Sequence, residues 1–264
     1  MGKINLDKYY TSKELAKYCI DKTYNIIGKQ NISEVIEPSA GNGSFSLQIP
    51  SLCWSYDIEP EHESIVKQDF LELDVKYLWG RLVIGNPPFG KKMYLAQQFF
   101  RKSIELGDYI AFILPISQLH NTSSLYQFDL IHSEDLGKQQ YSDRKLHCCF
   151  NIYKRPIDGE LNEKPNNKLK DVVIIRQDSS RYNNIMEYDL RMSYFGASAG
   201  RILNDNEDYC GVYKIIIHNK QLKCKINECL HNVDWYKELN FIAQPKIQQF
   251  HIVKVLKKYI PEIQ

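Results

Sequence analysis

The chain has 264 residues, of which 43% are hydrophobic and 12% aromatic, enough for one large domain or a domain with a substantial appendage. Its 34 Lys and Arg residues against 32 Asp and Glu give a net charge of +2, so it lacks the global basic excess typical of nucleic-acid-binding proteins. No apolar run approaches the ~20 residues that span a bilayer, and the polar, charged first residues predict no secretory signal.

The seven cysteines form no paired Cys-x-x-Cys pattern, which predicts reduced thiols and a cytoplasmic protein. Cys224, Cys229 and His231 lie close together in the sequence, but their spacing fits no structural zinc pattern. We therefore predict no metal site.

A first helix is predicted to follow Thr11 and Ser12, either of which suits an N-cap, and to end at Gly28. Tyr10 and Thr11 stand just before this helix. On the residues alone, capping and packing are the simpler roles for both.

The apolar strand at 35–36 runs into a glycine loop, Glu37-Pro38-Ser39-Ala40-Gly41-Asn42-Gly43. Two glycines separated by one residue let the backbone approach a ligand closely. The third glycine of a dinucleotide fingerprint is missing, since Ser46 stands there, so a pyrophosphate ligand is not indicated. Glu37 ends the strand, where it could pair with a ligand ammonium group.

Two more strands end in acidic residues. The run 52–56 leads to Asp57, about twenty residues beyond the first acid, where nucleotide-binding α/β folds place the acceptor for ribose hydroxyls. Ile58 can pack against an adenine face, and Asp69, before Phe70, could accept from an adenine amino group. Each acid alone is more simply a surface residue, but three in series favour a nucleotide site.

The buried strand 82–84 leads to the tetrapeptide Asn86-Pro87-Pro88-Phe89. The exocyclic nitrogen of adenine is a poor nucleophile because its lone pair is delocalised, so it needs acceptors for its two N–H groups. Asn86 offers a side-chain carbonyl, and Pro87 offers a backbone carbonyl held extended by Pro88. Phe89 offers a face on which a base can stack. A proline-rich turn is the plain alternative.

Lys91 and Lys92 follow the tetrapeptide and either contact phosphates or form a solvated pair. Phe150, in a later strand, is a candidate to pack against a base or to fill the core. Lys154 and Arg155 could contact a nucleic-acid backbone. The remaining predicted elements are a helix at 95–104, a strand at 109–115, a polar loop with a short strand at 120–144, strands at 146–155, 172–176 and 213–218, a connector at 156–170 and a final helix at 247–260. The small-residue segment 196–200, flanked by Arg191 and Arg201, is either a tight turn, which we prefer, or a loop that follows phosphates.

Over about residues 8–155, this series resembles the S-adenosylmethionine-dependent methyltransferases that modify the exocyclic amine of adenine in nucleic acid. The order of the motifs is that of the family's gamma arrangement. The resemblance assigns cofactor binding to Tyr10, Thr11, Glu37, Ser39, Ala40, Gly41, Gly43, Asp57, Ile58, Asp69, Phe70 and Asn86. It assigns catalysis to Asn86, Pro87, Pro88 and Phe89, and substrate binding to Phe89, Lys91, Lys92 and Phe150.

The resemblance implies an α/β, Rossmann-like class I methyltransferase with a mixed seven-stranded sheet at 1–155, and a small C-terminal α+β region at 156–264 for substrate recognition. It implies S-adenosyl-L-methionine as cofactor and no metal. The implied reaction is site-specific methylation of an adenine extruded from DNA, as in restriction–modification, with a partner subunit for recognition left open. The alternatives are an RNA adenine methyltransferase, a protein glutamine methyltransferase, which Phe89 disfavours, and a non-catalytic nucleic-acid-binding module.

Overall fold

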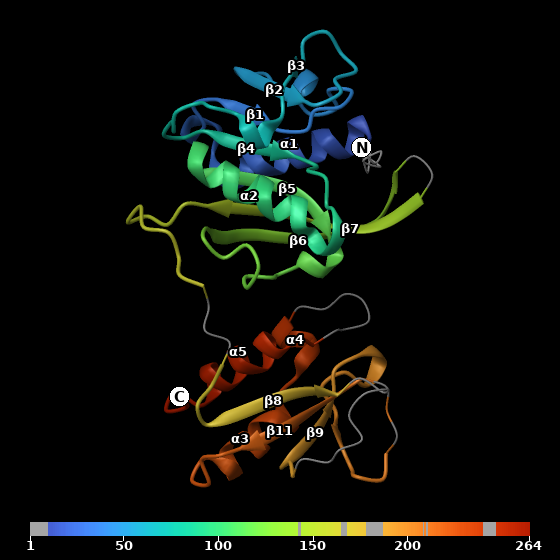
Figure 1. Ribbon diagram of the computed structural model, residues 1–264, viewed down its shortest axis with the longest axis vertical. Coiled ribbons are helices and arrows are strands. Elements are labelled where there is room, and N and C mark those ends of the chain that lie inside the picture. Colours follow the sequence, from blue (N-terminus) through green and yellow to red (C-terminus); the bar gives the residue numbers. More distant parts are fainter. Residues whose placement is uncertain are drawn as a thin grey trace. The chain divides into compact units, whose positions relative to one another are not determined.

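The computed structural model describes residues 10–141, 144–164, 168–177, 187–207, 209, 211–239 and 247–264 (Figure 1). The chain separates into two compact units, Met1–Lys164 and Pro165–Gln264, and each has its own hydrophobic core. Within the described residues, every helix is too short or too polar to span a bilayer.

Unit 1 is built on a seven-stranded sheet with the strand order β3-β2-β1-β4-β5-β7-β6 (Figure 1). Strands β1 to β5 pair in parallel, β7 lies antiparallel to β5, and β6 lies antiparallel to β7. This order is that of the class I methyltransferase fold, so the predicted fold class is confirmed. The strands are β1 Val35–Glu37, β2 Cys53–Asp57, β3 Val66–Lys67, β4 Leu82–Gly85, β5 Tyr109–Pro115, β6 Asp129–Tyr141 and β7 Arg144–Lys154.

The first helix has the predicted limits. In α1, Lys13–Ile27, the Ser12 side-chain oxygen accepts the Leu15 N–H at 3.2 Å. This N-cap satisfies one of the donors that a helix start leaves unpaired. At the other end, the Gly28 N–H donates to the Tyr24 carbonyl at a backbone φ of +84°, which glycine adopts without strain.

Two helices cover opposite faces of the sheet. The buried side of α1 packs against one set of strand residues, which includes Leu82, and α2, Tyr94–Leu106, packs against the alternate set, which includes Val83. Successive residues of a strand point to opposite faces, so the sheet is buried on both sides. Each fully buried aliphatic side chain stabilises the fold by roughly 1.5–3 kcal/mol.

For the segment 120–144 we predicted a loop with a short strand, and the structure differs. Most of it forms the 13-residue strand β6, which pairs with β7 and closes one edge of the sheet. Register shifts between Leu130 and His132 and between Asp135 and Gly137 interrupt its alternation. Because a bulge adds one residue to one strand, it hides the period of two by which a strand is recognised in a sequence.

The end of unit 1 lies beyond the predicted boundary at residue 155. Residues 156–164 return to this unit, where the Asn162 N–H donates to the Gln127 carbonyl at 2.9 Å. The Asn162 side-chain nitrogen donates to Asp129 at 2.9 Å. Two hydrogen bonds to the segment before and at the start of β6 therefore hold this stretch to unit 1.

Arg155, predicted as a possible contact for a nucleic-acid backbone, makes several contacts within unit 1. Its Nε lies 3.1 Å from Asp108, and its guanidinium lies 5.2 Å from the Tyr77 ring centre and 4.8 Å from that of Phe128. The side chain is used within the fold, and Lys154 beside it pairs across the sheet with the first residue of β5. Both residues thus lie at the amino end of β5.

Unit 2 is an α+β unit around a four-stranded antiparallel sheet with the order β10-β9-β11-β8 (Figure 1). The predicted strands at 172–176 and 213–218 and the final helix are confirmed, whereas β9, β10, α3 and α4 were not predicted. The elements are β8 Val172–Gln177, β9 Leu190–Ser193, β10 Ile202–Leu203, β11 Val212–Ile217, α3 Lys223–Asn232, α4 Trp235–Leu239 and α5 Gln249–Tyr259.

The small-residue segment 196–200 is a turn that packs on Trp235. Both flanking arginines are engaged locally, since Arg191 donates to the Asn204 carbonyl at 2.9 Å and Arg201 lies 2.7 Å from Glu207. The turn therefore serves the core of unit 2, in agreement with its prediction as a turn.

Two glycines of this turn give a matched pair for testing its packing. A Cβ added to Gly200 would lie 2.0 Å from Trp235 Cδ1, whereas one added to Gly196 would meet nothing within 4 Å. Both have positive φ, so either alanine costs roughly 1–2 kcal/mol in backbone strain. We expect Gly200→Ala to lower the free energy of unfolding by roughly 1–3 kcal/mol more than Gly196→Ala, measured by urea unfolding. Equal losses would show that the Trp235 contact is unimportant.

Candidate functional site

A cavity of about 470 Å³ opens at the carboxyl edge of the unit 1 sheet. Its walls come from the segments that follow β1, β2, β3 and β4, together with the first turns of α2. In open α/β sheets, ligands bind in the crevice outside the carboxyl ends of the strands. The fold therefore brings the predicted motifs, which are far apart in the sequence, to one place.

Most predicted site residues line this cavity. The cofactor set contributes all its members except one: Tyr10, Thr11, Glu37, Ser39, Ala40, Gly41, Asp57, Ile58, Asp69, Phe70 and Asn86. From the other sets, Pro88 and Lys91 also line it. Gly43 and Pro87 are buried beside it, Phe89 is partly buried, and Lys92 is exposed.

The glycine loop is held closed by Asp57. One carboxylate oxygen accepts the Gly41 N–H at 2.8 Å, and the other accepts the Glu59 N–H at 2.8 Å. Gly41 has a φ of +52°, and a Cβ there would lie 3.3 Å from the Tyr10 ring. Because a carboxylate has about four acceptor sites, Asp57 retains capacity for ligand hydroxyls while it fixes the loop.

Glu37 is a buried acid at the end of β1. It is 2% exposed and accepts the Ser46 N–H at 2.7 Å. Burial raises the pKa of this carboxyl to about 8, against the lowering effect of the Ser46 hydrogen bonds and with an added increase from Asp57. Near neutral pH the carboxyl favours its proton, and a ligand cation beside it would favour the carboxylate.

The raised pKa of Glu37 predicts a pH dependence of stability. The folded state binds this proton more tightly than the unfolded chain, whose pKa is near the usual 4.5, so Glu37 destabilises the fold progressively as pH rises from about 4.5 to about 8. Above that window its effect is constant. We expect the free energy of unfolding of the wild type to fall relative to Glu37→Gln across pH 5–8, measured by urea unfolding. Parallel curves for the two proteins would contradict a raised pKa.

Hydrogen bonds join the tetrapeptide after β4 to two other segments that line the cavity. The Asn86 side-chain nitrogen donates to the Thr11 hydroxyl at 3.3 Å, and the Ser39 hydroxyl donates to the Asn86 carbonyl at 3.2 Å. The Ser44 hydroxyl donates to the Thr11 carbonyl at 2.7 Å. Asn86 is therefore positioned by the segment before α1 and by the glycine loop.

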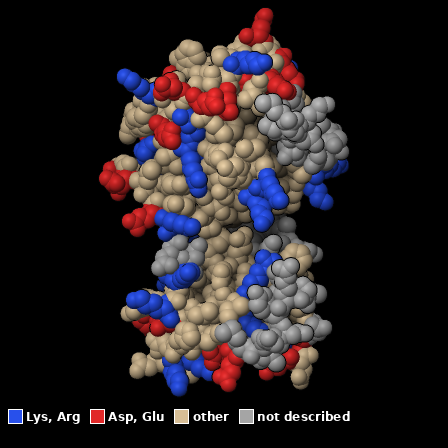
Figure 2. Space-filling view, in the orientation of Figure 1, with Lys and Arg blue, Asp and Glu red and all other residues tan. Residues whose placement is uncertain are grey.

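Phe89, Lys91 and Lys92 lie in the segment that connects β4 to α2. Phe89 packs against both hydrophobic clusters of unit 1 but remains partly exposed. Lys92 and Met93 have φ values of +53° and +68°, a left-handed backbone that costs roughly 1–2 kcal/mol for each non-glycine residue. On the face that Figure 2 shows, basic and acidic side chains of unit 1 are interspersed, in keeping with the net charge of +2.

The structure corrects the prediction for Phe150. Its side chain is fully buried in the cluster that includes α1, opposite Ile113 of β5. No ring face remains for a base. β7 lies between β5 and β6 and is buried on both sides, so its aromatic residues fill the core.

Ten residues outside the predicted sets also line the cavity: Pro38, Asn42, Ser44, Phe45, Glu59, Gln68, Leu71, Gly90, Leu95 and Phe99. Leu95 and Phe99 are one helical turn apart on α2, so the apolar periodicity of that helix was the available signal. Across the described part of the chain, no three His, Cys, Asp or Glu side chains gather as a metal site would require.

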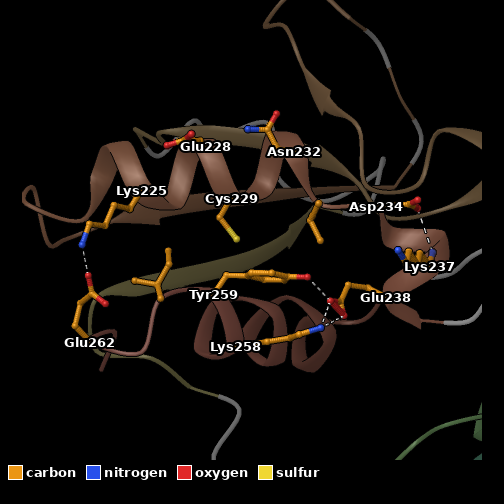
Figure 3. Close-up of a pocket in the computed structure, with 12 residues that line it drawn as sticks. Lys225, Glu228, Cys229, Asn232, Asp234, Lys237, Glu238, Lys258, Tyr259 and Glu262 are labelled. Atoms are coloured by element: carbon orange, nitrogen blue, oxygen red, sulfur yellow. Dashed lines mark hydrogen bonds and ion pairs between the residues drawn. The ribbon is translucent and has the colours of Figure 1, made fainter.

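A larger groove of about 910 Å³ lies in unit 2 between α3, α4 and α5 (Figure 3). Four of its charged side chains form two ion pairs, Lys225 with Glu262 and Lys258 with Glu238, and the Tyr259 hydroxyl also donates to Glu238. Burial raises the pKa of the Cys229 thiol, and the charge of Glu238 adds to the increase. Because a thiol reacts as the thiolate, this cysteine is not activated.

No protein-family model matches the chain, and no curated protein sequence matches it. Among solved structures, it is similar to a Pyrococcus horikoshii protein provisionally assigned as an RNA methyltransferase, with 16% identity, 60% of this chain and 91% of the other covered, and a TM-score of 0.48.

A 23S rRNA methyltransferase, ErmE, is similar at 15% identity, with 60% and 72% covered and a TM-score of 0.42. The magnesium protoporphyrin IX methyltransferase of Synechocystis is similar at 12% identity, with 55% and 77% covered and a TM-score of 0.37. These similarities are too distant to indicate a substrate, and the fold assignment rests on the strand order.

Proposed function

We propose that unit 1 binds S-adenosyl-L-methionine in the cavity and transfers its methyl group to the exocyclic amine of an adenine extruded from DNA. The observation that carries this proposal is the convergence of the glycine loop, Asp57 and Asn86 on one cavity at the carboxyl edge of a class I methyltransferase sheet. The resemblance of the tetrapeptide to adenine-specific enzymes supplies the target base.

The residues of the cavity fit this cofactor. Glu37, buried and with a pKa raised to about 8, gains a partner when it faces the ammonium group of the methionine part. Asp57 keeps acceptor capacity for the ribose hydroxyls after fixing the loop. Ile58 and Phe70 line the cavity with apolar surface that suits the adenine ring, and Asp69 stands beside them as an acceptor for its amino group.

Catalysis in this account is a matter of positioning and hydrogen bonding. When bound, the cofactor supplies a sulfonium methyl group that is already activated, so the chain needs no strong base. The side-chain oxygen of Asn86 and the backbone oxygen of Pro87 accept the two N–H groups of the target amine. These bonds return electron density to the nitrogen as the N–C bond forms and the C–S bond breaks, after which the surplus proton leaves to water.

The target base must leave its stack to reach the amide of Asn86, which costs a few kcal/mol of unstacking. Phe89 offsets part of this cost by stacking on the base. Lys91, which lines the cavity and is exposed, contacts a neighbouring phosphate. Lys92 does the same from the adjacent position.

Within the same proposal, unit 2 contributes to substrate recognition. A partner subunit would add to target reading if the protein works in restriction–modification. Neither role is needed for the chemistry, because the proposed catalytic residues all belong to unit 1.

The test is transfer of labelled methyl from S-adenosyl-L-methionine to a panel of duplex DNA, single-stranded DNA, RNA and protein. We expect label in DNA. Label in RNA alone would keep the chemistry and replace DNA by RNA, and label in protein alone would identify a protein methyltransferase. Cofactor binding by calorimetry without label in any polymer would overturn the enzymatic assignment in favour of a binding module.

A further inference from the structure

The paired ends of β6 and β7 form an arm that reaches past the rest of the unit 1 sheet (Figure 1). The last pair between β5 and β7 is Pro115 with Cys148, whereas β7 continues to pair with β6 through four more positions. We define the arm as residues 138–141 and 144–147. At about 3.3 Å per residue, its strands extend about 13 Å beyond β5.

The arm projects from the same edge as the cavity. β5 ends at Pro115 in the direction in which β4 ends before Asn86, since the two strands are parallel. β7 is two strands away from β4, a distance of about 10 Å at the usual spacing of 4.7–4.9 Å between strands. The arm therefore stands beside the proposed entry for the target base.

One face of the arm carries two lysines, a glutamine and a histidine at its four positions. In the register, Lys138 lies opposite His147 and Gln140 lies opposite Lys145, and alternate residues of a strand share a face. Lys138, Gln140 and Lys145 are exposed, and none of these four positions is acidic.

This donor face lies on the α2 side of the sheet. Cys149 and Tyr153, which alternate with His147 along β7, pack in the cluster that includes α2, whereas Leu146 packs in the cluster that includes α1. Lys91 and Lys92 occupy the turn that begins α2, so they lie on the same side as the donor face.

The base of the arm is fixed in shape. Asp135 accepts the Gly137 N–H at 2.6 Å and lies 2.7 Å from His147 Nε2. Gly137 has a φ of +70° at the register shift. One carboxylate thus closes the bulge and joins the two strands, which gives the arm a defined direction.

We propose that the donor face of the arm binds phosphates of the substrate strand next to the extruded nucleotide. The inference rests on the proposed function and adds the surface that holds the substrate in register with the cavity. A polyanion is the occupant that suits this face, since its two exposed lysines have no acidic residue among the four positions and the one carboxylate at its base, that of Asp135, is engaged with His147 and the Gly137 N–H. A second lysine pair lies on the same side of the sheet.

The test compares the double variant Lys138→Ala/Lys145→Ala with the matched control Lys29→Ala/Lys76→Ala. Lys29 and Lys76 are exposed lysines of the same unit that lie near the amino edge of the sheet: Lys29 precedes β1, and the Lys76 carbonyl accepts from Arg81, the residue before β4. Both variants lose two positive charges. Fluorescence anisotropy with labelled duplex DNA, at several salt concentrations, measures Kd without requiring turnover.

We expect the arm variant to bind DNA at least tenfold more weakly, and the slope of log Kd against log salt to become shallower by about 1.8, or about 1.4 on single strands. The control should keep the slope, the Kd and the kcat of the wild type. An unchanged slope in the arm variant, or an equal loss in the control, would overturn the inference. So would normal DNA binding with an altered oligomeric state, which would assign the arm to contact with a second copy.

The two proposals can fail separately. DNA binding that depends on the arm, without methyl transfer to any polymer, would overturn the function and keep the arm as a phosphate-binding surface. If the arm variant transfers methyl groups with the wild-type KM for DNA and the wild-type salt slope, the proposed function stands and the arm is not a phosphate-binding surface.

Discussion

Asn86→Ala is expected to lower kcat for methyl transfer by roughly 100- to 1,000-fold, the loss typical of removing one acceptor or donor that acts on the reacting atoms. Asn86 lines the cavity and is positioned by Thr11 and Ser39, so its carbonyl is the side-chain acceptor that the target amine requires. Transfer is measured under saturating substrate, and the Kd for the cofactor should change much less than kcat.

The matched control for this variant is Asn42→Ala. Asn42 also lines the cavity, but it stands in the glycine loop, where its side-chain oxygen lies 2.6 Å from the Ser44 hydroxyl oxygen. It should keep kcat within a few-fold of the wild type. If Asn86→Ala retained a tenth or more of the activity, the role of the tetrapeptide would be wrong.

Asp57→Ala is expected to raise the Kd for S-adenosyl-L-methionine by roughly 30- to 100-fold. The change removes two charge-assisted hydrogen bonds that hold the loop, each worth about 1.5–3 kcal/mol when made to a charged group, and the acceptor for the ribose hydroxyls. Calorimetry measures the Kd directly.

Asp74→Ala controls for the loss of one negative charge, since Asp74 is exposed and does not line the cavity. It should bind the cofactor as the wild type does. Asp57→Asn keeps a side-chain oxygen, so its Kd for the cofactor should lie between the Kd of Asp57→Ala and that of the wild type. Cofactor affinity within threefold of the wild type for a folded Asp57→Ala protein would remove Asp57 from the cofactor site.

The parts of the site that could be predicted are those that follow strand ends. Glu37, Asp57 and Asn86 each come at the end of, or directly after, an apolar run, and parallel neighbours bring their carboxyl ends to one edge. Local sequence was sufficient because the strand and the functional residue are adjacent in the chain. The same reasoning found α1, through its Ser12 cap and Gly28 end.

The incorrect predictions concern residues and elements whose environment is set by distant parts of the chain. The sequence around Phe150 does not reveal that β7 is buried on both faces. That burial follows from the place of β7 between β5 and β6. The strand predicted within 120–144 was too short, because the sequence of β6 is polar and its bulges break the alternation. α3 was missed because only Ile226 and Leu230 of its ten residues are buried, too few to mark an apolar face.

The central claim is that Asn86 presents the amine of an adenine in DNA to a methyl donor in the cavity. The most direct measurement is mass spectrometry of nucleosides from DNA incubated with the protein and S-adenosyl-L-methionine that carries a deuterated methyl group. The account predicts deuterated N6-methyladenine in DNA with the wild type and none with Asn86→Ala. Deuterated methyl on another base, or equal N6-methyladenine with both proteins, would contradict it.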